Sequence, residues 1–97
     1  MTPDTLRSIE TEPAGLTPAL RALRLDARGD WNAAHDALQD DPGADTSWVH
    51  AYLHRKEGDL GNAGYWYRRA GQPTPTGPLD DEWHRIATAL LAAQSTP

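Results

Sequence analysis

The sequence predicts a small all-α fold, and two observations carry that prediction. The aliphatic residues are mostly Leu and Ala, with 11 Leu and 15 Ala against 2 Ile and 1 Val, and this balance favours helices over strands. Helix caps and breakers also recur at short intervals between stretches with helical periodicity. Because 97 residues support a single hydrophobic core, we expect one helical domain.

The first predicted helical hairpin begins at Thr17, which precedes Pro18 as an N-cap precedes a proline at the first helical position. Gly29 suits the left-handed residue that closes a helix, and Asp30 suits the N-cap of the next one. That next helix stops before the turn sequence beginning at Asp41. The expected helices cover 18–28 and 31–39, within a hairpin at 17–41.

The second predicted hairpin repeats the same signals. Asp45 or Thr46 restarts the chain, and Gly58 closes the third helix. Asp59 then caps a fourth helix, which ends at Gly71. The expected helices cover 47–57 and 60–70, within an antiparallel hairpin at 45–71.

A proline-rich connector at 72–78 follows and favours extended, semi-rigid geometry. Beyond it the sequence predicts a C-terminal capping helix at 79–94, with acidic residues in its first turn. Its apolar residues recur at helical spacing along one face. These residues are Leu79, Trp83, Ile86 and Leu90.

The N-terminal segment 1–16 lies outside the predicted domain at 17–97. Pro3 and Pro13 interrupt its helical periodicity. We therefore expect a flexible, mostly irregular arm, with at most one short helical turn around Leu6 and Ile9.

The two hairpins also resemble each other in sequence. Residues 20–42 align with residues 49–71 at an offset of 29, which matches Gly29-Asp30 with Gly58-Asp59 and Ala34 with Ala63. Small residues at such positions let helices approach closely, as in stacked helical repeats. The pattern predicts an internal repeat.

The second half of this repeat resembles known repeat families. Gly58, Asp59 and Leu60, followed by Ala63, Tyr67 and Ala70, resemble the second half of a tetratricopeptide unit, and the segment 66–70 is similar to the end of Sel-type repeats. The run 50–71, with its segments HRKEGD and NAGYWYRRAG, also resembles a group of small uncharacterised bacterial and fungal proteins. The repeat resemblance implies a role in protein interaction, whereas the second resemblance implies no particular activity.

Three histidines and one glutamate form a candidate metal site. His50, His54 and Glu57 share one stripe of the third predicted helix, at spacings of four and three residues. The short turn before that helix makes it an antiparallel neighbour of the second helix, which brings His35 level with the stretch between His50 and His54. Three imidazoles and a carboxylate without sulfur suit a divalent Zn, Ni, Fe or Mn ion.

A structural role for this cluster is the alternative. Buried neutral histidines usually form hydrogen bonds that specify how helices pack. The metalloprotease motif HExxH is absent, because Ala51 follows His50.

Trp66, Arg68 and Arg69, with Arg55 nearby in the sequence, form a second candidate site, for an anion or an acidic peptide. An indole beside guanidinium groups binds anions by stacking and bidentate hydrogen bonds. In the structural alternative, Trp66 packs beneath Pro73 or Pro75 of the connector. The arginines then pair with acidic residues, namely Asp59, Asp80 or Asp81.

Composition excludes several classes of function. The net charge of −5 argues against nucleic-acid binding. The absence of cysteine excludes disulfides and thiolate metal sites. No apolar run reaches the length of a membrane span, and the N-terminus lacks the pattern of a signal peptide, so we expect a cytoplasmic protein that does not bind membranes.

The function predicted from these observations is protein interaction or assembly, including self-association as a homodimer. Two repeats are fewer than a helical solenoid needs for independent stability, so either the last helix and the N-terminal arm complete the core or the chain self-associates. The alternative is a metal-binding protein or metal-dependent enzyme that uses His35, His50, His54 and Glu57. No nucleophile motif or phosphate-binding loop favours an enzyme.

Overall fold

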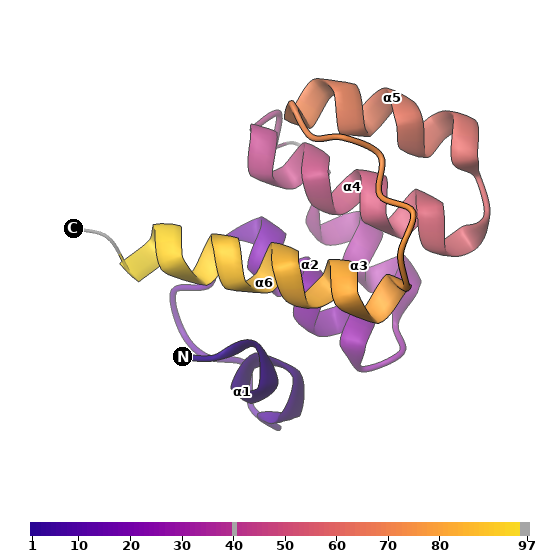
Figure 1. The fold of residues 1–97 in the computed structure, drawn as a ribbon. Helices are drawn as coiled ribbons and strands as arrows, with labels where there is room; N and C mark the ends of the chain where they lie inside the picture. The colour runs from indigo at the N-terminus through magenta and orange to yellow at the C-terminus, as the bar shows by residue number, and fades with distance from the viewer. Residues whose placement is uncertain (40, 96–97) are drawn as a thin grey trace.

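The computed structural model describes residues 1–39 and 41–95 and contains six helices and no strand within them (Figure 1). The all-helical prediction is confirmed. The helices are α1 Pro3–Ser8, α2 Pro18–Ala27, α3 Trp31–Ala37, α4 Ala44–Glu57, α5 Leu60–Ala70 and α6 Leu79–Ser95. None of these helices is long and apolar enough to cross a membrane.

The helices form two pairs, crossed by the C-terminal helix. α5 lies along α4, α3 packs on α2, and the connector passes over α4 to reach α6 (Figure 1). Local signals set most helix ends within two residues of the prediction. The side chain of Asp30 accepts the Ala33 backbone N–H at 3.0 Å, and that of Asp59 accepts the Asn62 N–H at 3.2 Å, as the N-cap role requires.

The start of α4 differs from the prediction by three residues. We predicted a restart at Asp45 or Thr46, but Gly43 is the N-cap and the helix begins at Ala44. The side chain of Asp41 accepts the Gly43 backbone N–H at 2.9 Å. This turn after Pro42 delivers the chain directly into the helix, because Gly43 adopts extended backbone angles without a side-chain cap.

The main core draws residues from every helix except α5. Trp83 of α6 is fully buried in it, and its indole N–H donates to the Leu23 carbonyl of α2 at 3.0 Å. A smaller cluster of Ala51, Ala63 and Tyr67 holds α5 against α4. Tyr67 is fully buried, and the small alanines let these two helices approach closely.

The N-terminal segment contains a longer helix than predicted. Pro3 occupies the first position of α1, where proline is tolerated, and the side chain of Thr2 accepts the Thr5 backbone N–H at 3.1 Å. Leu6 is fully buried in the main core. The expected short helical turn around Leu6 is thus a six-residue helix, while residues 9–16 form no helix. Tertiary burial of Leu6 supplies what local helix propensity lacks.

Two buried carboxylates tie α4 to its neighbours. Asp26 of α2 accepts hydrogen bonds from the Tyr52 hydroxyl at 3.1 Å and from the Lys56 amine at 2.8 Å. Glu82 of α6 accepts from Arg55 at 3.0 Å and from the Tyr67 hydroxyl. Burial, together with the neighbouring carboxylate, raises the pKa of each tyrosine. Both contacts set the position of the helix that carries two of the cluster histidines.

Candidate metal centre

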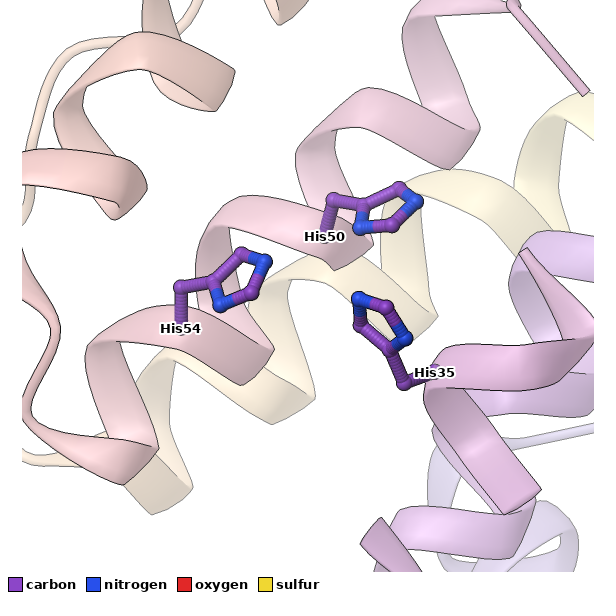
Figure 2. A group of neighbouring side chains, drawn as sticks. All are labelled: His35, His50 and His54. Atoms are coloured by element: carbon purple, nitrogen blue, oxygen red, sulfur yellow. The ribbon is translucent and has the colours of Figure 1, made fainter. Parts of the chain in front are cut away.

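The three histidines of the predicted site meet in space. His50 and His54 lie one turn apart on α4, and His35 reaches them from α3 (Figure 2). The ring centroid of His35 is 5.0 Å from that of His50 and 5.4 Å from that of His54. One ligand nitrogen from each ring lies within 4.8 Å of the other two. The predicted convergence of the three imidazoles is confirmed.

Two tryptophans hold the imidazole rings in place. Trp31 stacks on His35 with centroids 5.1 Å apart and an angle of 11° between the rings, while its indole N–H donates to the Leu53 carbonyl. Trp66 of α5 stacks on His50 at 4.2 Å and 10°. These contacts restrict ring rotation, which preorganises the cluster for a ligand.

His54 has a carboxylate on one ring nitrogen. The Nδ1 atom lies 2.7 Å from Glu57 Oε1, and a hydrogen bond at this distance places the proton on Nδ1. Nε2 then accepts a hydrogen bond from the side-chain amide of Asn62 at 3.4 Å, which a metal ion bound at Nε2 would replace. Metal-binding histidines commonly donate their second N–H to a carboxylate, which orients the ring and increases its basicity.

Glu57, the fourth residue of the predicted site, therefore contacts His54 on the side away from His35 and His50. Together with Asp59 and His54 it makes a second group of potential ligand atoms within 4.8 Å of one another. Both carboxylate residues are exposed. Exposed acidic groups pair readily with water, so the three-histidine group, in which His50 and His54 are buried and His35 is half-buried, is the stronger candidate for a metal ion.

His50 has a buried ring nitrogen that forms no hydrogen bond with the described residues. It is 7% exposed, and its Nδ1 atom is sealed from solvent without a hydrogen-bond partner in the described part of the chain. Burial, and then the neighbouring His35, His54 and Arg69, lower its pKa from 6.5 to about 4. The ring is therefore neutral at pH 7, which is the form that binds metal ions.

The fold does not bring together the four residues of the predicted anion site. Arg55 turns to Glu82 and to the Gly77 carbonyl, away from the other three residues. Arg68 is exposed on α5. Only Trp66 and Arg69 come together, with the guanidinium carbon 5.3 Å from the indole centroid. Neither the anion site nor its structural alternative fully describes these residues. Trp66 packs on His50, and Arg55 pairs with Glu82, which neither alternative named.

Three supporting residues of the site were not predicted. These are Trp31, Trp66 and Asn62. The contacts of Trp66 and Asn62 with the histidines depend on how α5 lies against α4. No local sequence signal reports that register.

Comparisons of the chain with protein-family models, curated proteins and solved structures find no match. The tetratricopeptide and Sel-type resemblance stays a prediction.

Proposed function

We propose that this protein binds a divalent transition-metal ion through His35, His50 and His54. The observation that carries the proposal is the meeting of three imidazole nitrogens from two helices within 4.8 Å. Imidazole is a preferred ligand of zinc, nickel, copper and iron ions. Three protein ligands leave a coordination position for water or a further ligand, as in catalytic rather than structural zinc sites.

The distances are compatible with coordination after small side-chain movements. Metal–nitrogen bonds of about 2.0–2.1 Å in a tetrahedral site place the ligand nitrogens about 3.3 Å apart. Because the nitrogens already lie within 4.8 Å of one another, coordination requires them to approach by at most about 1.5 Å, which small shifts of the side chains provide. Glu57 would keep the His54 ring oriented through its Nδ1 hydrogen bond.

The buried, unpartnered nitrogen of His50 favours metal binding over a purely structural cluster. A structural histidine network is stable when its buried nitrogens are hydrogen-bonded. Leaving one unsatisfied costs about 1–3 kcal/mol, and the Nδ1 atom of His50 has no partner in residues 1–39 and 41–95. Bonding of that lone pair to a metal ion would remove this cost.

The test measures metal stoichiometry and affinity in tag-free protein. Elemental mass spectrometry gives the metal content after purification, and titration calorimetry gives the affinity of EDTA-treated protein for Zn, Ni, Mn and Fe(II). We expect about one ion per chain, and a loss of affinity of tenfold or more in each of His35→Asn, His50→Asn and His54→Asn. A wild-type protein that neither contains nor takes up metal would refute the proposal.

The fourth histidine offers a matched control. His84 lies on α6, where its ring contacts the Asp80 carbonyl and the Asp4 carboxylate and stays outside the cluster. His84→Asn removes an imidazole without touching the proposed site. We expect unchanged metal affinity in this variant. An equal loss in His84→Asn would show that the binding is not specific to the cluster.

Protein interaction or self-association is a second candidate function. A groove between the connector and α6 favours it, because half-buried Trp48 lies there beside Gln72 and Arg85. The predicted repeat organisation of the two hairpins also supports this function. Light scattering at micromolar concentration, with quenching of tryptophan fluorescence, tests it: we expect a dimer in which Trp48 is shielded. A monomer with Trp48 open to the quencher would contradict self-association.

A further inference from the structure

A pocket of about 450 Å³ lies beside the histidine cluster, between the end of α3, the loop before α4, and α5. His50, Trp66 and Arg69 line it together with the loop residues Asp41 and Pro42. His35 and His54 do not line it. His50 therefore separates the pocket from the other two histidines, with one edge in the cluster and the other toward the pocket.

Arg69, an exposed residue of α5, brings hydrogen-bond donors to this pocket. A guanidinium has five N–H donors, and Arg69 uses one of them on the Tyr65 hydroxyl at 3.2 Å. Among the described residues, no carboxylate lies within ion-pair distance of it. Its guanidinium carbon lies 5.3 Å from the Trp66 centroid and 5.9 Å from that of Tyr65. Stacking of this kind leaves the planar fork free to bind an oxyanion in a bidentate manner.

His50 adds a second donor when a metal ion is bound. Coordination through Nδ1 places the ring proton on Nε2, because a neutral imidazole carries one proton. Metal-binding histidines usually donate this N–H to a carboxylate, a carbonyl or water. No described residue accepts a hydrogen bond from His50, and the ring lines the pocket. This N–H is therefore available to water or to a ligand in the pocket.

The one described carboxylate in the pocket lining is already engaged. The side chain of Asp41 accepts the backbone N–H of Gly43 at 2.9 Å and so serves the turn before α4. The Asp41 carboxylate places a negative charge in the pocket lining, which repels an anion that Arg69 attracts. The site therefore favours a small oxyanion that can sit against Arg69 and His50 over a large, highly charged one.

We propose that a small oxyanion, such as a carboxylate, sulfate or phosphate group, binds between Arg69 and the Nε2–H of metal-bound His50 and strengthens metal binding. This inference rests on the proposed metal site. The anion accepts the imidazole proton and thereby makes the ring a better donor to the metal, while the metal makes that proton a better hydrogen-bond donor. Linkage requires the two ligands to strengthen each other by the same factor.

The test compares zinc affinity in two salts. EDTA-treated protein is titrated with zinc by calorimetry in sodium chloride and in sodium sulfate at equal ionic strength, so that general screening is matched. We expect sulfate to tighten zinc binding by about fivefold or more, at the lower end of usual coupling. Arg69→Gln should remove this gain and keep zinc affinity in chloride within about twofold, because Arg69 is not one of the proposed metal ligands.

Arg68→Gln is the matched control, since it removes the same charge from the next position of α5, where the side chain does not line the pocket. It should retain the gain in sulfate. Loss of the gain in both variants would show an effect of net charge and overturn the inference. Equal zinc affinity of the wild-type protein in the two salts would overturn it while leaving the metal site standing, whereas absence of zinc binding would overturn both proposals.

Discussion

At the scale of single residues, His50 combines deep burial with two neighbouring imidazoles, and its environment opposes protonation. Its folded-state pKa of about 4 lies below the ordinary value of 6.5. Between these values the unfolded chain binds more protons than the folded one, so folding becomes less favourable as the pH falls through this window. The group leaves stability unchanged above pH 6.5.

For metal-free protein we therefore predict that lowering the pH from 7 to 4 reduces the free energy of unfolding by up to about 3 kcal/mol through His50 alone. Urea unfolding in EDTA at several pH values measures the loss, and nuclear magnetic resonance follows the titration of the His50 ring. His50→Gln should show a shallower dependence between pH 6.5 and 4. A ring that titrates near pH 6.5 would contradict the prediction.

The buried carboxylate of Glu82 makes its partner Arg55 important for stability. Glu82 is 1% exposed, and Arg55 donates to it at 3.0 Å. Arg55→Met leaves a buried charge without its ion pair, for which we predict a loss of about 3–5 kcal/mol in the free energy of unfolding. The exposed Arg68 provides the comparison, because Arg68→Met should change stability by no more than about 0.5 kcal/mol. Similar losses in the two variants, measured by urea unfolding, would argue against the ion pair.

At the scale of elements, the turn between α4 and α5 depends on one backbone angle. Gly58 has a φ of 89°, and no atom lies within 4 Å of the position that a Cβ would take there. Gly58→Ala therefore tests backbone strain without a steric clash. We predict a loss of about 1–2 kcal/mol, the cost of the left-handed conformation for a residue with a side chain.

Gly61 gives the opposite outcome within the same hairpin. It lies in the first turn of α5 with helical geometry and has equal space around its Cβ position. We predict that Gly61→Ala raises the free energy of unfolding by about 0.5–1 kcal/mol, because alanine loses less backbone entropy on folding. Thermal and urea unfolding of the two variants measure this contrast. A loss at both positions would mean that the hairpin does not tolerate a side chain at either site.

At the scale of the whole molecule, α1 completes the core that the two hairpins and α6 leave open. Leu6 is fully buried, and Arg7 lies over the Trp83 ring at 4.4 Å while pairing with Asp80 at 2.7 Å. We predict that Leu6→Ala lowers the free energy of unfolding by about 2–5 kcal/mol. Leu60→Ala, at a position that is 68% exposed, should change it by no more than about 0.5 kcal/mol. A tolerant Leu6 would show that α1 is dispensable for the fold.

Sequence reasoning located most helix ends because the interactions that set them are local. Asp59 caps α5 through an amide three residues away, and Gly58 closes α4 through its own backbone angle. Both signals can be recognised without knowing the tertiary fold. The start of α4 was missed because the turn at Asp41 competes with the cap that Asp45 or Thr46 would provide.

Sequence reasoning predicted the part of the candidate site that follows from helical spacing and from the short connection between α3 and α4. His50 and His54 share a face because they lie four residues apart, and the tight turn before α4 makes α3 its neighbour and brings His35 to the same level. The sequence by itself thus determined the helices, the short turns and the meeting of these three histidines.

Only the tertiary structure decided how these parts are supported. The pairing of Arg55 with Glu82 and the stacking of Trp66 on His50 join residues at least 16 positions apart. The burial of Leu6 likewise places α1 against residues of other helices. Such contacts depend on the relative placement of whole helices, which results from packing the entire core rather than from any local pattern. For the same reason the sequence placed Arg55 and Arg69 in one patch, whereas packing against α6 separates them.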